Sequence, residues 1–273
     1  MNPPKPSALI SILSWDSPRY LSNLLDNLDA RVPSHAGDVD THIHILDQGS
    51  SEECRQLIDA FVAGRSGRTA EFLKQNVGFS RGHNHVFDLV HRHRPFDFFV
   101  PVNQDVLFGH SGWLDQLVAG MRDESVAVGG PVAWRLCDAP GALLETFPAS
   151  ESDPERIYSI QGSVAIVRAR VVERFGLFDN AFTPAYFEDT DLCRRYVHAG
   201  YRLARISVEH VHSYLGPKQK LIRQKKDALR TAFGDFRTRN MHLFIRRWMN
   251  GTPPPVTADT LHEHWPHVYR PQR

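Results

Sequence analysis

A mostly parallel α/β sheet flanked by helices is the fold class that the sequence predicts. Three nearly continuous apolar runs, at residues 8–14, 42–46 and 96–102, have the length and composition of buried strands. Each run ends in polar residues, and apolar residues at helical spacing follow each one. The repeated order of strand, polar turn and helix is typical of a parallel sheet, because parallel neighbours need a crossover connection.

Composition bounds the class of protein. The chain has 273 residues, of which 41% are hydrophobic and 23% charged, so it is long enough to bury a large core. A net charge of +1 argues against a nucleic-acid partner bound by bulk phosphate neutralisation. No stretch approaches the roughly 20 apolar residues that span a bilayer. Cys54, Cys137 and Cys193 are odd in number and lack CxxC spacing, which predicts reduced thiols and a cytoplasmic protein.

The first two strands are each followed by a helix. Pro18 opens a helix after the first strand, and a polar turn beginning at Asp47 precedes the second helix. Ligands of parallel sheets bind beyond the carboxyl ends of the strands, where Asp47 lies. An aspartate there accepts a hydrogen bond from a nucleobase or ribose, or it forms an Asx turn; both interpretations stay open.

A glycine-containing turn follows the third strand, which we expect at residues 71–73. It spans residues 74–84, and Gly78 and Gly82 would let backbone N–H groups approach a phosphate or sugar. The alternative is that these glycines supply only backbone freedom.

The central strand at residues 96–102 ends in Asn103, Gln104 and Asp105. A carboxylate at the end of a central strand, with a second oxygen ligand nearby, suits a hard divalent cation that also holds a diphosphate. The alternative is an Asx-type turn.

The second half of the chain has a less regular pattern. Residues 126–128 predict a fifth strand, and the irregular residues 135–153 predict a substrate-side loop. We expect one strand at residues 157–167, with Gly162 at its centre, and a last strand at residues 201–212. In that last strand His210 and His212 share one face.

An acidic helix start lies between these two strands. Glu188, Asp189 and Asp191 follow an aromatic pair and precede an apolar helical stripe. A carboxylate at a helix start is held ionised by free backbone N–H groups, and beside an aromatic wall it is typical of a general base for a hydroxyl nucleophile. The alternative is that Asp189 caps the helix while Asp191 pairs with Arg194 or Arg195.

The C-terminal region changes in composition. Residues 218–247 predict a helical region rich in Lys and Arg, and residues 252–273 predict an extended tail. The basic face docks on anionic lipid, holds a phosphate-bearing acceptor, or is simply solvated.

Four motifs in this order resemble the inverting family 2 glycosyltransferases of the GT-A fold, especially the bacterial rhamnosyltransferase-like members. They are NVGFSRGHN, VNQDV, QGSVAIVRARVVERFGLFDNAFTPAYFEDTDLCRRYVHAGYRL and VEHVHSYLG. The resemblance covers about residues 8–215. It implies a GT-A domain at residues 1–215, with a donor half up to about residue 130 and an acceptor half after it. Residues 216–273 form a basic helical extension and tail.

The resemblance also implies a reaction and its partners. The donor would be a UDP-, TDP- or GDP-sugar, and the acceptor a saccharide or lipid-linked saccharide in polysaccharide biosynthesis. A hexosyl or deoxyhexosyl group would move to a hydroxyl of this acceptor. Docking of the basic C-terminal helix would place the protein peripherally at the inner membrane face.

Site residues carry over from the motifs. Asp189 resembles the catalytic base, with Glu188 beside it, and Asp47 resembles the aspartate that contacts the nucleobase or ribose. Asp105 resembles the last aspartate of the metal-binding DxD motif, and His212 the histidine that closes the site, with His210 as the alternative. The remaining donor-binding residues are Asn76, Gly78, Arg81, Gly82, Asn84, Asn103 and Gly162.

The implied cofactor is Mn²⁺ or Mg²⁺. Asn103 replaces the first aspartate of the DxD motif, so the site has one anionic ligand fewer, and the metal would be held chiefly through the donor diphosphate.

Two other functions remain to be distinguished. A nucleotidyltransferase would have a glycine-rich loop after the first strand, and the segment SWDSPRY lacks one. A non-catalytic nucleotide-sugar-binding homologue fits Asn103, but Glu188, Asp189 and His212 are all retained.

Overall fold

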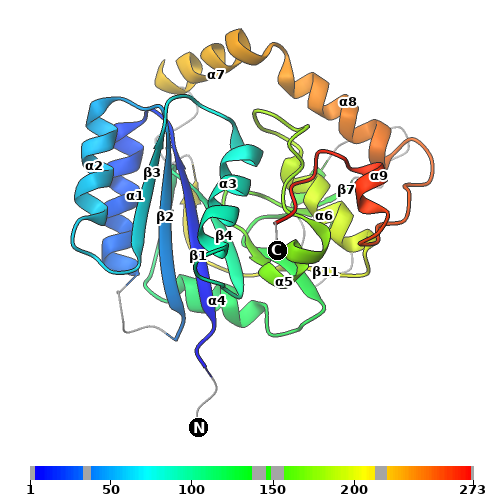
Figure 1. Cartoon of the computed structure of the whole chain (residues 1–273), viewed down its shortest axis with the longest axis horizontal. Helices are drawn as coiled ribbons and strands as arrows, with labels where there is room; N and C mark the ends of the chain where they lie inside the picture. Colours follow the sequence, from blue (N-terminus) through cyan, green and yellow to red (C-terminus); the bar gives the residue numbers. More distant parts are fainter. Residues whose placement is uncertain (1–3, 33–37, 137–145, 149–156, 213–219, 272–273) are drawn as a thin grey trace.

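The computed structural model describes residues 4–32, 38–136, 146–148, 157–212 and 220–271 (Figure 1). Its main sheet has seven strands in the order β11-β6-β10-β4-β1-β2-β3. Cys137 and most of residues 135–153 lie outside the described residues, as does the start of the basic region at residues 218 and 219. Cys54 and Cys193 are buried free thiols, as predicted.

Four parallel strands form one half of the sheet. They are β1 (Ser7–Ser14), β2 (Asp40–Gln48), β3 (Arg68–Leu73) and β4 (Phe98–Asn103). β1 lies between β2 and β4, with Ser14 beside Asp47 and Leu13 beside Asn103. The carboxyl ends of these strands therefore meet at one edge, as the three apolar runs predicted.

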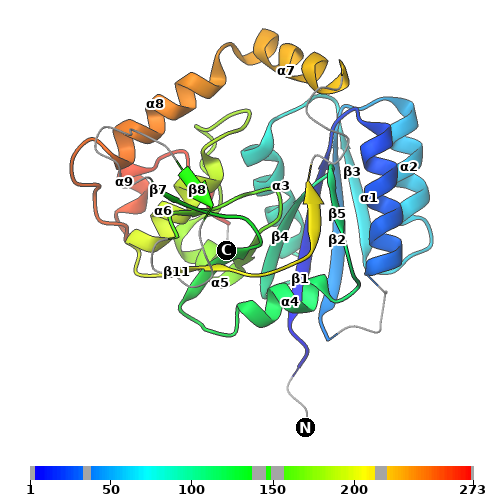
Figure 2. The ribbon, with the colours of Figure 1, turned by 180° about the vertical axis from the view of Figure 1, so that it is seen from behind.

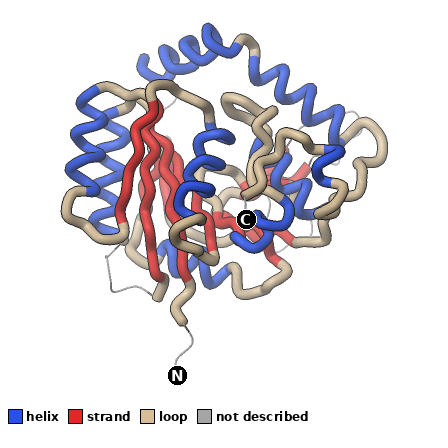
Figure 3. The backbone as a smooth tube through the Cα atoms, in the orientation of Figure 1, coloured by secondary structure: helices blue, strands red, loops and turns tan. Residues whose placement is uncertain are grey.

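Helices cover both faces of the sheet (Figure 3). One apolar cluster joins the sheet to α1 (Pro18–Arg31), α2 (Glu52–Val62) and α4 (Trp113–Gly120). A second cluster on the other face includes side chains of α3 (Phe79–His91), α5 (Ala169–Phe175) and α6 (Glu188–His198). The core is thus divided into two layers by the sheet, which gives the strands their nearly continuous apolar character.

The other half of the sheet is mixed. β10 (Ile166–Arg168) runs antiparallel between β4 and β6 (Val126–Gly130), and β11 (Arg202–Arg205) runs parallel to β6. The expected strand at residues 157–167 is two strands, because the chain turns at Gly162 between β9 (Ser159–Ile160) and β10. β9 instead pairs with β7 (Ala133–Leu136), which also pairs with β8 (Thr146–Pro148).

The expected last strand also divides in two. After β11 the chain leaves the main sheet, and β12 (His210–His212) pairs with β5 (Val106–Phe108), a short strand that the sequence did not predict (Figure 2). This two-stranded sheet places His212 opposite Val106, next to the end of β4.

The C-terminal region contributes to the main core. It forms α7 (Lys220–Phe233), α8 (Phe236–Trp248) and α9 (Leu261–His264). Phe244, Trp248, Leu261 and Trp265 belong to the same apolar cluster as α3 and α6. Burial of Leu261 and Trp265 explains why the expected extended tail contains a helix.

The basic helix α7 crosses the edge at which the parallel strands end (Figure 1). Among the described residues, no helix combines the length and apolar character that crossing a bilayer requires.

Candidate functional site

A cleft of about 300 Å³ lies at the carboxyl ends of the parallel strands. Segments far apart in the chain form its wall: the ends of β1, β2 and β4, the start of α3, the turn before α6, and α7. Four of the predicted site residues line it, namely Asn76, Gly78, Asn103 and Asp105. The other lining residues are Leu13, Trp15, Ser17, Tyr20, Gln48, Phe79, Gln104, Pro184, Ala185 and Leu229.

The ends of β1 and β4 are joined by one side chain. The Gln104 Oε1 accepts from the Trp15 backbone N at 3.2 Å, and its Nε2 donates to the Trp15 carbonyl at 3.3 Å. Since the side chain both accepts from and donates to the Trp15 backbone, it fixes the spacing of the two strand ends that form the cleft wall.

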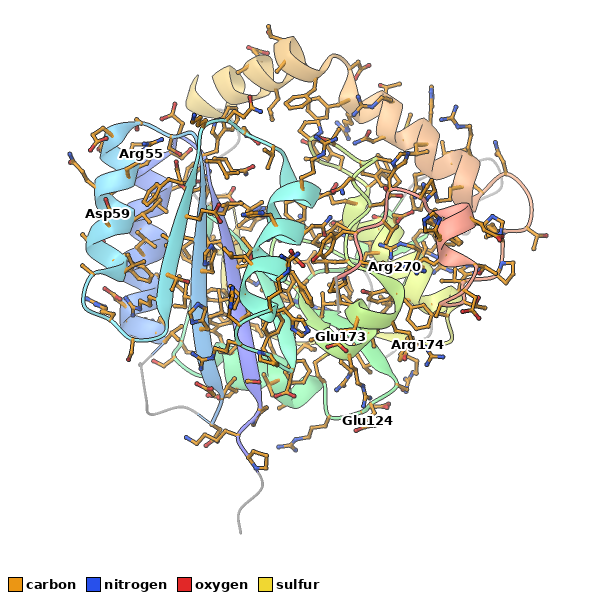
Figure 4. The ribbon with its side chains drawn as sticks, in the orientation of Figure 1. Arg55, Asp59, Glu124, Glu173, Arg174 and Arg270 are labelled. Atoms are coloured by element: carbon orange, nitrogen blue, oxygen red, sulfur yellow. The ribbon has the colours of Figure 1, made fainter. Side chains whose placement is uncertain are left out.

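Asp47 lies at the end of β2 and is fully buried. Its Oδ2 accepts from the backbone N of Gly49 at 3.2 Å and of Ser50 at 3.1 Å, which is the Asx-type turn considered above. Arg55, on α2 near the strand ends, has its Nε 3.9 Å from the same oxygen (Figure 4). The Oδ1 has no hydrogen-bond partner among the described residues. A buried oxygen left without a donor costs about 1–3 kcal/mol, which makes a ligand N–H or O–H a natural partner.

The motif at residues 74–84 is half turn and half helix. Gly78 has a φ of 89° and ends the turn. The Gly78 backbone N donates to the Asn76 Oδ1 at 2.8 Å. A Cβ at Gly78 would lie 2.8 Å from the backbone of Pro184, so only glycine fits there. α3 then begins at Phe79, earlier in the motif than expected.

The helical residues of this motif have other surroundings. A Cβ at Gly82 would lie 2.9 Å from the Leu13 side chain, so this glycine allows α3 to approach β1 closely. Asn84 is buried and exchanges hydrogen bonds with the backbone of Phe178 at 2.9 and 3.0 Å. Arg81 is exposed on α3. Neither Asn84 nor Arg81 is among the residues that line the cleft.

Asp105 and His212 are brought together by the pairing of β5 with β12. The His212 Nε2 lies 3.3 Å from the Asp105 Oδ1, and both side chains are about a quarter exposed. His210 instead has its Nδ1 3.0 Å from the Val208 carbonyl. Among the described residues, no group of three or more His, Cys, Asp or Glu side chains gathers at metal-binding distance.

Asp189 lies at the start of α6 and contacts the Gly162 turn. Its Oδ2 accepts from the Gly162 backbone N at 2.9 Å, and its Oδ1 accepts from the Thr190 backbone N at 2.7 Å. A Cβ at Gly162 would lie 3.2 Å from the Phe79 ring and 3.4 Å from the Asp189 Cβ. Because Phe79 lines the cleft, the Asp189 carboxylate lies immediately behind the cleft wall.

The two acids of the pair differ in environment. Burial raises the pKa of Asp189, although hydrogen bonds from Gly162 and Thr190 oppose the rise. Burial, followed by repulsion from Asp189, raises the pKa of Glu188 well above its usual range, and the Glu188 Oε2 has no partner among the described residues. Glu188 therefore retains its proton more strongly, and Asp189 carries the negative charge of the pair.

The turn before α6 is strained. Tyr186 and Phe187 have φ values of 76° and 71°, in the left-handed region that bulky side chains avoid. Each such residue costs roughly 1–3 kcal/mol, and the surrounding structure must hold it. Strain of this kind often accompanies a functional site, and here it directly precedes the acid pair.

His83 packs behind Phe79 and gives a prediction on stability. It is buried, its Nδ1 lies 2.8 Å from the Ser11 Oγ, and its ring contacts Phe79 edge-on at 4.4 Å. Burial lowers its pKa to about 3, so the folded protein holds it neutral while the unfolded chain takes up a proton below about pH 6.5. Its contribution to stability is complete above that pH and is lost on acidification, by about 2 kcal/mol between pH 7 and pH 5.

We expect His83→Gln to flatten the pH dependence of urea unfolding between pH 7 and pH 5. His93→Gln, on the segment after α3, is the control and should leave the slope unchanged. Equal slopes for wild type and His83→Gln would contradict the assignment of this residue as a buried neutral imidazole.

Several lining residues escaped prediction. Trp15 and Gln104 stand directly after predicted strands, so their position at the ligand-binding edge was a usable signal. Pro184 and Ala185 lie within the third motif quoted above but were not chosen as site residues, and Leu229 comes from a distant helix in which no local pattern marks it.

Comparison with known proteins supports the fold. By sequence, no protein-family model and no curated protein matches the chain. By structure, it is similar to the mannosyltransferase PcManGT from Pyrobaculum calidifontis, solved in complex with GDP-Man and Mn²⁺. The TM-score is 0.65 and the identity 16%, over 94% of this chain and 68% of that chain.

A second similar structure is GalNAc-T7, solved with UDP, GalNAc and Mn²⁺. The TM-score is 0.62 and the identity 11%, over 96% of this chain and 58% of that chain, so the chain spans well under two thirds of the GalNAc-T7 chain. Both are glycosyltransferases of the GT-A fold. The likeness confirms the predicted fold class: the protein has a GT-A-like α/β fold with a mostly parallel sheet flanked by helices.

Proposed function

We propose that the protein is an inverting glycosyltransferase of the family 2 type, which transfers a hexosyl or deoxyhexosyl group from a nucleotide diphosphate. The observation that carries this proposal is the convergence of two groups on one cleft at the strand ends. The Asp105–His212 pair lies at one part of it, and Asp189 lies behind Phe79 at another. A GT-A-like fold with 16% and 11% identity to sugar transferases is consistent with it.

Asp189 acts as the general base in this proposal. Its carboxylate takes the proton of an acceptor hydroxyl while that oxygen attacks the anomeric carbon from the face opposite the nucleotide, which inverts the centre. The raised pKa of Asp189 makes its carboxylate more basic than that of an exposed aspartate. Glu188, whose pKa lies higher still, stays protonated beside it.

Asp105 and His212 would hold the divalent cation. One carboxylate oxygen and one imidazole nitrogen at 3.3 Å from each other suit Mn²⁺ or Mg²⁺ if the donor diphosphate supplies further oxygens. This fits the Asn103 replacement, because the protein alone then gives too few ligands. When bound, the cation would neutralise charge on the departing diphosphate. His212 is the better candidate than His210, whose Nδ1 lies against the Val208 carbonyl.

The nucleotide would occupy the cleft between β1, β2 and β4. Asn76, Gly78 and Asn103 line that cleft, and the buried Asp47 Oδ1 could accept an N–H or O–H from the nucleobase or ribose. Arg81, Gly82, Asn84 and Gly162 complete the proposed donor-binding set, with Gly82, Asn84 and Gly162 serving through the packing of the elements around the cleft.

The acceptor would enter beside α7. Leu229 of this helix lines the cleft, and the sequence of α7 is rich in Lys and Arg. A saccharide linked to an anionic lipid suits such a helix, and peripheral contact with the inner membrane face would follow from the same charge.

A thermal-shift screen tests the donor class. UDP, GDP, TDP and CDP are each added with and without Mn²⁺, because a ligand that binds only the folded state raises the melting temperature. At 100 times Kd the gain is about 2.7 kcal/mol, which is several degrees for a chain of this size. We expect one nucleotide to give this shift, and only with Mn²⁺.

The matched variant is Asp105→Asn, which keeps the shape of the side chain and removes its charge. We expect it to lose the Mn²⁺-dependent part of the shift. A wild type that responds to none of the four nucleotides would overturn the proposal. Binding without transfer to any saccharide would instead favour the non-catalytic homologue, and a response to nucleoside triphosphates alone would favour a nucleotidyltransferase.

A further inference from the structure

The part of the C-terminal helix α8 between Phe236 and Phe244 contacts the strained turn before α6. Asn240 of α8 is fully buried, and its Nδ2 donates to the Ala185 carbonyl at 2.9 Å. The same nitrogen lies 3.3 Å from the Tyr186 carbonyl and 3.4 Å from the Thr183 carbonyl. The two N–H donors of one amide group are thus shared among three carbonyls of the turn, and they hold the turn in the conformation with positive φ values.

Neighbouring side chains of α8 hold the rest of the turn. Arg239 donates to the Thr183 carbonyl, and its Nε also donates to the Asn240 Oδ1 at 3.2 Å, which orients the amide. Phe236 stacks on Tyr186 with 5.9 Å between ring centroids, and Phe244 stacks on Phe187 at 5.5 Å. The two residues of the turn with positive φ therefore each stack against an aromatic ring of α8.

The same helix also holds the first turn of α6 from the other side. Asp191 is buried and accepts from the Arg247 guanidinium at 2.8 Å and from the Trp248 Nε1 at 2.9 Å. Glu188 and Asp189 lie between the two sets of contacts, one made through Asn240 and the other through Arg247 and Trp248. Both ends of the segment that carries the acid pair are thus fixed to α8.

We propose that α8 positions the catalytic base, with Asn240 as the residue that sets the turn and thereby aims the Asp189 carboxylate at the cleft. The Asn240 amide reaches the cleft wall only through the Ala185 carbonyl and, among the described residues, makes no hydrogen bond to Glu188 or Asp189, so Asn240 is a positioning residue that acts through the backbone of residues 183–187. Loss of its amide leaves the Ala185 and Tyr186 carbonyls without this donor and the Thr183 carbonyl with Arg239 alone. The turn then relaxes toward ordinary φ values, and Asp189 loses its bond to the Gly162 N–H. The catalytic part of this inference rests on the proposed function.

The first variant is Asn240→Ala, with Asn240→Ser as a milder change that keeps a short donor. Arg246→Ala is the matched control, because Arg246 is exposed on the same helix. We expect Asn240→Ala to lower kcat by about 10- to 100-fold, since small displacements of a catalytic group have effects of this size. Nucleotide diphosphate binding should stay within about threefold of wild type, because Asp47, Asn76 and Asn103, the side chains proposed to contact the nucleotide, lie on other elements.

The pH profile separates positioning from a loss of folded protein. Burial raises the pKa of Asp189, and Glu188 and the buried Cys193 thiol are the titratable groups near it. A relaxed turn lets water reach the carboxylate, which lowers its pKa, and removes the Gly162 hydrogen bond, which raises it; burial is the larger of the two influences. The acidic limb of kcat/KM should then shift along the pH axis in Asn240→Ala, whereas a smaller folded fraction would scale the rate equally at every pH.

A readout without activity completes the test. Hydrogen exchange of the Gly162 backbone N–H should be at least tenfold faster in Asn240→Ala than in Arg246→Ala, because its bond to Asp189 is weakened. Unchanged exchange would overturn the positioning role whatever the kinetics show, and unchanged kcat with faster exchange would overturn its catalytic part. A wild type that transfers no sugar would refute the proposed function instead, and the exchange experiment would still decide whether α8 aims Asp189.

Discussion

Asp189→Asn is expected to lower kcat by about 10³-fold while nucleotide binding is retained. The amide has the shape of the carboxylate and still accepts from the Gly162 N–H, but it cannot take a proton from the acceptor. Removal of a general base typically costs between 10² and 10⁴ in rate. Single-turnover transfer from the donor identified by the thermal-shift screen measures the effect.

Stability separates this loss from misfolding. The raised pKa of Asp189 means that its charged form is disfavoured in the folded protein at neutral pH, so Asp189→Asn should keep or increase the melting temperature. Glu52→Gln, at the exposed start of α2, is the matched control for an acid in a first helical turn. Transfer within tenfold of wild type in Asp189→Asn would move the role of base to Glu188.

Arg247→Met is expected to lower the free energy of unfolding by about 3–5 kcal/mol. The Arg247 guanidinium bridges Asp179 and Asp191 at 2.8 Å each, and both acids are fully buried. Methionine fills a similar volume but leaves Asp179 without this cation, and removal of one partner from a buried ion pair costs about this much. Urea unfolding at pH 7 measures the loss.

The pH dependence of that loss identifies its cause. Burial alone would raise the pKa of Asp191, and the ion pairs with Arg247 and Arg195 more than offset this, so the pKa is lowered in the wild type. Without Arg247 the acid takes up a proton more readily, so the deficit should shrink as the pH falls from 7 to 5. Arg230→Met, which removes an exposed pair with Asp227 at 3.9 Å, should cost less than about 0.5 kcal/mol. A similar loss in both variants would show that burial of the Arg247 network is not what matters.

The parallel half of the sheet could be predicted because its signals are local. Runs such as residues 8–14 and 96–102 are apolar throughout, and a strand covered on both faces requires this. The strands at residues 157–167 and 201–212 were predicted as single strands because apolar residues recur along each segment. The chain nevertheless turns at Gly162 and leaves the sheet before His210, and both changes depend on partners elsewhere, namely Asp189 and β5.

The candidate site was predictable where residues stand at strand ends or helix starts. Those positions were the reason for choosing Asp47, Asn103, Asp105 and Asp189. In the structure, Asn103 and Asp105 line the cleft and Asp189 lies immediately behind its wall. Asp47 is buried next to Gln48, which lines the cleft. Asn240 could not be identified in this way. Its amide bonds to carbonyls more than fifty residues away, and a sequence pattern carries no information on such a contact.

The dependence of α6 on α8 has a consequence for synthesis on the ribosome. Asp191 emerges 56 residues before Arg247 (residue 247 minus residue 191), and at about 5–20 residues per second this is about 3 to 11 s. During that interval the nascent chain holds an aromatic turn and a carboxylate that is buried in the folded protein, and the partners of both on α8 have not yet been synthesised. A chaperone that binds apolar surface would bind this segment before α8 is synthesised. Synonymous codons that slow translation between residues 191 and 247 would lengthen the time for which the segment is exposed. The yield of folded protein should therefore respond to translation speed in this window.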